Sequence, residues 1–310
     1  MQFTIPTREE NHPFLQLLIL VAGAIVGIIV FAIIGFVICL GIYGLDLIRN
    51  LEWTTGDDLR YVGALKILIT AQQIGLFLVP AVALAIFEGK KPHRFYGMIT
   101  PNINLLGIVF LLMLCSTPLM GWVNEWNMSL HLPQSFSKIE QWMRKMEDEG
   151  AVTTKAILAG KSFGALAINL FVVGLVPAIC EELIFRGGLQ RTFLRLIKNP
   201  HIAIWLSAII FSTIHFQFFG FFPRLFLGAM FGYIYFWTKN IWYTIFAHFL
   251  NNAYAVTLMW YFQRNNLPMD KADETNIAWY GYLISAILTI ALFWILKDKT
   301  TKKEEVLPEI

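Results

Sequence analysis

The chain has 310 residues, of which 57% are hydrophobic and only 15% are charged, and its formal net charge at pH 7 is +3. Soluble domains typically carry roughly 25% charged residues. With a mean hydropathy of +0.60, the composition excludes an ordinary soluble protein and predicts an all-α polytopic membrane protein. The three cysteines lie far apart in apolar runs, without a CxxC or Cys/His metal spacing. We expect the lipid bilayer as a partner and no nucleic acid.

Eight apolar runs approach the length of about 20 residues that a helix needs to cross a bilayer. We therefore expect about eight transmembrane helices. The first run is too long for a signal-peptide core of about 7–15 residues, so we expect it to be retained as a span. Only a short break at Gly220, Phe221 and Pro223 separates the fifth run from the sixth. The predicted spans are residues 14–43, 62–87, 104–123, 163–185, 202–219, 221–238, 241–262 and 277–296.

The long segment between the third and fourth spans contains the sequence SKIEQWMRKMEDEG. Ser137 and Glu140 have the spacing of a capping box, while Ile139, Trp142 and Met146 fall on one helical face. The pattern predicts an amphipathic helix, which either lies on the outer membrane surface or packs as a connector on the bundle.

Lys and Arg residues favour the cytoplasmic side of a membrane protein. More of them fall on that side when the N-terminus is placed inside. We therefore predict an integral protein of a bacterial inner membrane with both termini in the cytoplasm.

Polar side chains inside the predicted spans are the candidate functional residues, because each ionisable group at bilayer depth costs roughly 3 kcal/mol or more. They are Glu181, Glu182 and Arg186 in the fourth span, His215 in the fifth, and His248 and Asn252 in the seventh. At 1.5 Å per residue, Glu181, His215, His248 and Asn252 fall about 8–20 Å from the predicted cytoplasmic helix ends. This shared depth indicates that these four converge.

Helical spacing divides the charged cluster. Glu182 and Arg186 are four residues apart and share a face, with the acid N-terminal to the base, which favours an ion pair. Glu181 is rotated by about 100° from Glu182 and is predicted to face the bundle interior without a pairing base. Pro177 lies four residues earlier and can bend the helix there.

A carboxylate, two imidazoles and an amide suit hydrolysis of an acyl bond by water. Glu181 can act as the general base with help from a histidine, and a second histidine with an amide can stabilise the oxyanion. Structural roles stay open beside this one: His215 can be a core histidine, and His248 with Asn252 can be a helix-packing pair.

Two alternatives use the same residues differently. Glu181, His215 and His248 are a possible ligand set for a catalytic zinc ion, although asparagine is a poor zinc ligand and no HExxH motif is present. A proton-coupled transporter would also use intramembrane Glu and His, but the sequence has no repeated half with matching broken helices.

Three short segments resemble a known family. EELIFRGGL is similar to an EExxxR motif, FSTIH to an FxxxH motif and HFLNN to an HxxxN motif of the CPBP intramembrane proteases. This family includes CAAX prenyl endopeptidases and bacteriocin-processing or immunity-type relatives. The motifs occur in order within residues 181–252, and residues 1–160 carry no such motif.

The resemblance implies an intramembrane endopeptidase with a catalytic cavity inside the helical bundle that opens toward the cytoplasm, and a membrane-associated peptide or protein substrate. Glu181 would activate water with His215, while His248 and Asn252 would form the oxyanion site, with zinc left open as a cofactor. A non-catalytic immunity or scaffolding protein is the alternative. We accordingly divide the chain into N-terminal helices with the outer loop (1–160), a catalytic core (161–262), and a last helix with a charged cytoplasmic tail (263–310).

Overall fold

The computed structural model describes residues 9–49, 59–268 and 277–305. These ranges contain helices and no β-strand. Six helices are long and apolar enough to cross a membrane, which confirms the prediction of an all-α polytopic membrane protein. The six are Pro13–Tyr43 (α1), Val62–Phe87 (α3, η3 and α4), Ile103–Met128 (α6), Phe163–Ile197 (α8 to α10), Phe218–Thr238 (η7 and α12) and Trp279–Thr301 (the main part of α14).

The other two of the eight predicted spans are helical, but one is too short and the other is not apolar enough to be counted among these six. Pro200–Thr213 (α11) has 14 residues, which is about 21 Å of helix. It turns back and packs along α12 (Phe221–Thr238). Ile241–Arg264 (α13) has 24 residues, but polar side chains such as His248 and Asn252 lower its mean hydropathy. The polar residues that build the site thus weaken the signal of a span.

The fourth span extends well beyond its predicted end at residue 185. The helix runs on through Val176–Glu182 (α9), the π-helical segment Leu183–Gln190 (η6) and Arg191–Ile197 (α10). Arg186 is 1% exposed inside this helix, so it does not mark a helix end at the membrane interface. Glu181 accordingly lies in the middle of a 35-residue helix, farther from its end than the sequence predicted.

A close contact between glycines joins α1 to the second span. Val62–Gln73 (α3) passes into a π-helical segment, Ile74–Leu78 (η3), and then into Val79–Phe87 (α4). A Cβ atom on Gly27 would lie 2.0 Å from the carbonyl oxygen of Gly75, and one on Gly75 would lie 2.4 Å from that of Gly27. Only glycine permits this approach of two backbones.

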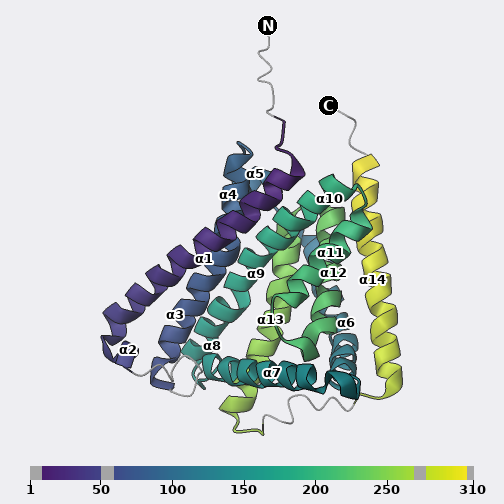
Figure 1. Ribbon diagram of the computed structural model, residues 1–310. Coiled ribbons are helices and arrows are strands. Elements are labelled where there is room, and N and C mark those ends of the chain that lie inside the picture. Colours follow the sequence, from purple (N-terminus) through teal and green to yellow (C-terminus); the bar gives the residue numbers. More distant parts are fainter. Residues whose placement is uncertain (1–8, 50–58, 269–276, 306–310) are drawn as a thin grey trace.

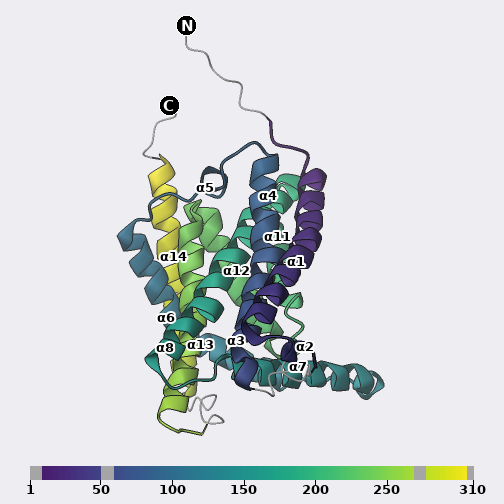
Figure 2. The ribbon, with the colours of Figure 1, turned by 90° about the vertical axis from the view of Figure 1, so that its left-hand side faces the viewer.

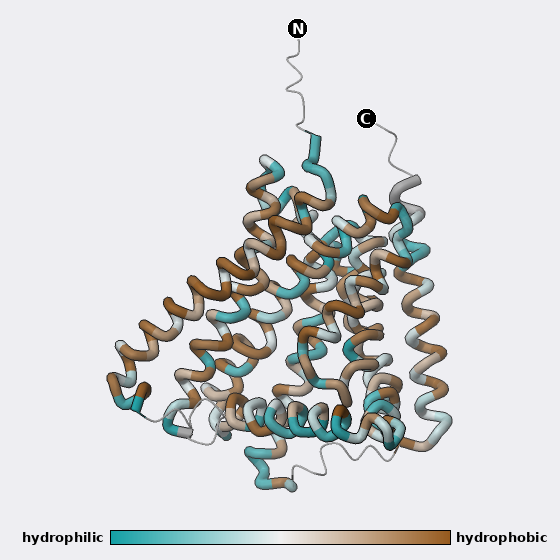
Figure 3. Tube along the Cα trace, viewed as in Figure 1, coloured by the Kyte–Doolittle hydropathy of each residue, from teal (hydrophilic) through white to brown (hydrophobic). Residues whose placement is uncertain are grey.

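The helix Ser137–Ile157 (α7) lies across one end of the bundle (Figures 1 and 2). The predicted helix is confirmed, but the predicted capping box is wrong. Ser137 makes no side-chain cap, because Glu140 instead binds the backbone N–H of Leu132 at 2.9 Å and the guanidinium of Arg144. The pKa of Glu140 is lowered to about 2, chiefly by Arg144 and His131. In Figure 3, α7 mixes hydrophilic and hydrophobic residues, whereas α1 is hydrophobic along most of its length.

The start of α1 and the end of α14 (Trp279–Glu305) lie at the end of the bundle opposite α7 (Figure 1). At this end, Glu10 forms ion pairs with Lys90, Arg191 and Arg195, which connect the segment before α1 to the end of α4 and to α10. Six apolar helices agree with an integral membrane protein. The assignment of this end to the cytoplasm stays a prediction.

The glycine contact gives a test of the packing. Gly27→Val should lower the free energy of unfolding by about 3 kcal/mol, because its side chain must push η3 away from α1. Gly41→Val is the matched control on the same helix, since a Cβ atom at Gly41 meets no atom within 4 Å. Thermal unfolding of the detergent-solubilised variants measures both. Equal stability of the two variants would contradict the packing described.

Candidate active site

The two adjacent glutamates at the end of α9 point to different neighbours. Glu181 is 4% exposed. Its Oε1 accepts a hydrogen bond of 3.0 Å from Nε2 of Gln73, the last residue of α3. Its Oε2 lies 3.8 Å from Nε2 of His248 on α13. Side chains from three helices therefore meet at this carboxylate.

Glu182 is completely buried and forms an ion pair with Arg186, as the sequence spacing predicted. The Nη1 atom of Arg186 lies 2.9 Å from Oε1 of Glu182, without the alignment of a hydrogen bond. The Nη2 atom of Arg186 donates to the carbonyl of Gly228 on α12 at 2.9 Å. This guanidinium therefore links two helices through one charge.

Glu182 also contacts His248, which the spacing could not predict. Its Oε1 lies 2.8 Å from Nδ1 of His248. A carboxylate paired with an arginine only accepts, so the proton of this hydrogen bond belongs to Nδ1. In a neutral ring, Nε2 is then an acceptor facing Glu181, and in an imidazolium it is a donor. Glu182 thus sets both the orientation and the tautomer of His248.

Two phenylalanines enclose this polar group. Phe211, the first residue of the FxxxH motif, packs edge-on against both His215 and His248 and under the guanidinium of Arg186. Phe231 on α12 stacks on His248 with ring centroids 5.4 Å apart. The aromatic walls exclude water, which strengthens the charge interactions they surround.

His215 occupies a turn and does not lie in a span as predicted. The helix α11 ends at Thr213, where Nδ1 of His215 binds the carbonyl of Phe211 at 2.7 Å. A carbonyl can only accept, so Nδ1 carries the proton and Nε2 of the neutral ring is left as an acceptor. The next residue, Phe216, has a φ of 53°. Such left-handed backbone in a non-glycine residue is strained and is typical of functional sites.

Asn252 fills a gap that a proline creates. Pro177 has no N–H group for the carbonyl of Val173, four residues earlier in the π-helical segment Leu170–Leu175 (η5). The Nδ2 atom of Asn252 donates to that carbonyl at 3.2 Å. The helix-packing role considered for Asn252 is therefore present, and its amide keeps one further N–H.

Within the part of the chain that the structure describes, the side chains do not form a metal centre. No group of three His, Cys, Asp or Glu side chains in the described ranges is placed to hold a metal ion. The alternative ligand set of Glu181, His215 and His248 fails this test. The donors of this set that remain are Nε2 of each histidine and Oε2 of Glu181, since the other atoms are engaged, and the three side chains do not form a group that could hold a metal ion.

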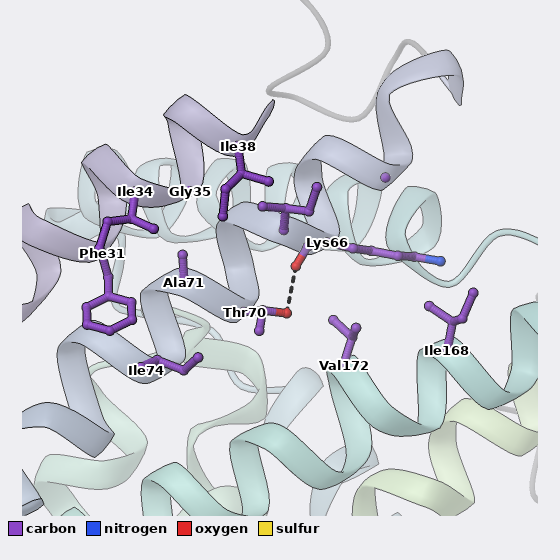
Figure 4. Close-up of a pocket in the computed structure, with 12 residues that line it drawn as sticks. Phe31, Ile34, Gly35, Ile38, Lys66, Thr70, Ala71, Ile74, Ile168 and Val172 are labelled. Carbon is purple, nitrogen blue, oxygen red and sulfur yellow. Dashed lines mark hydrogen bonds between the residues drawn. The ribbon is translucent and has the colours of Figure 1, made fainter. Parts of the chain in front are cut away.

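A mostly apolar cavity of about 550 Å³ lies between α1, α3 and α8 (Phe163–Asn169). Ile74 and Val172 line it, and their chain neighbours Gln73 and Val173 contact Glu181 and Asn252. Lys66 is the charged residue in the lining, and Thr70 donates a hydrogen bond to its carbonyl at 2.8 Å (Figure 4). The lining does not include Glu181, His215, His248 or Asn252, so the cavity lies among the N-terminal helices and η5 and is separate from the polar site.

Gln73, Phe211 and Phe231 are site residues that were not predicted from the sequence. Gln73 carried a signal, since a polar side chain in the apolar run AQQIGLFLVP is itself unusual. Phe211 carried one as the first residue of the FSTIH segment, of which only His215 was given a role. Phe231 carried none, because apolar aromatic residues occur throughout the spans.

Glu182→Ala should lower the free energy of unfolding by about 3 kcal/mol or more, because it leaves the buried guanidinium of Arg186 without its counter-charge. Glu181→Gln should cost only about 1 kcal/mol, since an amide oxygen can still accept from Gln73. Thermal unfolding of both proteins in the same detergent compares them. Equal losses would contradict the division of roles between the two glutamates.

Known proteins are similar to the part of the chain that contains the candidate site. The model of the family "Type II CAAX prenyl endopeptidase Rce1-like" matches residues 163–254. Two proteins of Bacillus subtilis are similar: "Uncharacterized protein YpbD", 28% identical over 41% of this chain, and "Putative membrane peptidase YdiL", 31% identical over 35% of it. These matches span 60% and 44% of the two relatives, less than two thirds of each. No solved structure matches the chain.

The matched segment contains all three motifs and the residues Glu181, His215, His248 and Asn252. The resemblance noted from the motifs is confirmed by this match, which makes residues 163–254 of the chain similar to the Rce1-like family.

Proposed function

We propose that this protein is an intramembrane endopeptidase in which Glu181 activates a water molecule to hydrolyse a peptide bond. One observation carries the proposal. The Glu181 carboxylate is buried at mid-helix, where one oxygen is held by Gln73 and the other faces His248. A buried carboxylate whose oxygens are distinguished in this way is suited to proton transfer.

The proposed reaction has two steps. The water oxygen attacks the carbonyl carbon, its proton passes to Glu181, and the electron pair of the C=O bond moves to the oxygen. The C–N bond then breaks, and Glu181 returns the proton to the leaving nitrogen. His215 supports the first step, because its free Nε2 can accept a hydrogen bond from the water.

The oxyanion is assigned to His248 and Asn252. His248 can donate from Nε2 as an imidazolium, held in place by Glu182. Asn252 can donate its second amide N–H while the first stays on Val173. Each donor directed at the developing charge lowers the barrier, typically by about 3 kcal/mol.

The substrate we propose is a membrane-associated peptide or protein with an apolar segment at the scissile bond. The cavity between α1, α3 and α8 is mostly apolar and, at about 550 Å³, has the size of small-molecule pockets. The family that matches residues 163–254 is described as a CAAX prenyl endopeptidase family. A peptide that ends in a CAAX sequence is therefore the first substrate to test. We place the cleavage near the cytoplasmic face, following the predicted orientation.

Glu181→Gln should abolish cleavage, with a loss of at least about 100-fold in kcat, because the amide cannot accept the proton of water. The purified chain in lipid nanodiscs is incubated with one CAAX-ended peptide in farnesylated and unmodified forms, and products are identified by mass spectrometry. Comparing the two forms shows whether the prenyl group is needed. Full activity of Glu181→Gln would overturn the mechanism. If neither form is cleaved, and no peptide in a mixture of membrane peptides is cleaved, the result would favour the non-catalytic alternative.

Cleavage should persist within about twofold in the presence of EDTA or 1,10-phenanthroline, since the described donors do not converge on a metal position. The same protein preparation should contain far less than one zinc per chain by elemental analysis. Loss of activity with the chelator, restored by added zinc, would overturn the assignment of Glu181 as a metal-free base.

A further inference from the structure

We infer that Gln73 is a positioning residue of the active site, contributed by the N-terminal helices outside the matched family region. The inference rests on the proposed function of Glu181. The geometry is specific: Nε2 of Gln73 donates to Oε1 of Glu181 at 3.0 Å, although 108 residues separate the two in the chain. The hydrogen bond occupies one carboxylate oxygen and leaves Oε2 toward His248.

The second polar atom of Gln73 supports a role beyond helix packing. Its Oε1 is buried without a hydrogen-bond partner among the described residues. A buried amide oxygen of this kind costs free energy unless it gains a partner in another state of the protein. Beside a water-activating carboxylate, that partner is the second hydrogen of the attacking water.

The backbone around Gln73 holds this orientation. Gln73 is the last α-helical residue before the π-helical segment η3. A π-helical turn changes the direction of the side chains next to it and is frequent at functional sites. The contact of Gly75 with Gly27 of α1 fixes η3 in place, and η3 packs on α9, which carries Glu181.

The charged and titratable groups near Glu181 lie on several elements. His248 comes from α13 and His215 from the turn after α11. Cys180 and Glu182 flank Glu181 on its own helix, and Arg186 follows there as the partner of Glu182. Gln73 contributes the neutral donor to this carboxylate. A neutral donor holds the carboxylate without supplying a proton or neutralising its charge, as a positioning residue for a general base should.

The test uses Gln73→Met, which keeps the side-chain length but removes both polar atoms. We expect kcat on the cleaved CAAX peptide to fall roughly tenfold, the rate equivalent of one hydrogen bond to a charged group, with KM unchanged. Gln73→Ala should behave alike. Gln72→Met is the matched control, because Gln72 is the exposed neighbour on the same helix, and it should keep wild-type kcat and KM. Thermal unfolding shows that each protein is folded.

Each outcome decides the inference. A selective loss of kcat in either folded Gln73 variant supports positioning, and the second variant serves if the first does not fold. Normal kcat in both, with Glu181→Gln inactive, overturns the role of Gln73 and leaves the proposed function standing. A rise in KM at normal kcat also overturns it, in favour of simple substrate binding. Full activity of Glu181→Gln would show instead that the proposed function itself is wrong.

Discussion

The site depends on one buried carboxylate oxygen, Oε1 of Glu182, which contacts both Arg186 Nη1 at 2.9 Å and His248 Nδ1 at 2.8 Å. Removing either charge from a buried pair typically costs about 3–5 kcal/mol. Any shift of Glu182 relative to Arg186 would therefore also change the position of His248. The contact that stabilises the bundle therefore also orients His248, and the neighbouring Glu181 takes no part in the ion pair with Arg186.

Irregular helix geometry gives the remaining side chains their positions. Pro177 and the π-helical segment before it leave the carbonyl of Val173 to be bound by Asn252. A second π-helical segment directly follows Gln73. Regular helices would satisfy their own backbone and offer no such attachment points for side chains of other helices. Both polar anchors of the site, Asn252 and Gln73, therefore occur where the α-helical hydrogen-bond pattern changes.

Local periodicity was enough to predict contacts within one helix. The four-residue spacing placed Glu182 on Arg186 and turned Glu181 away, and the structure has both features. Periodicity contains no information on how helices pack against one another, so the bonds from Glu182 to His248 and from Gln73 to Glu181 were not predicted. The predicted end of the fourth span at residue 185 was wrong for a physical reason: the helix continues past Arg186 because Glu182 compensates its charge inside the bundle.

The family region at residues 163–254 does not by itself delimit the active site. It contains the acid, the histidines and the asparagine, but the donor to Glu181 comes from Gln73 on α3. That donor is held by η3, and η3 is held by α1 through a contact that only glycines at positions 27 and 75 allow. A shift of α1 would therefore reach the carboxylate through two packed elements. The N-terminal helices therefore contact the proposed catalytic carboxylate, even though their sequence carries none of the three motifs.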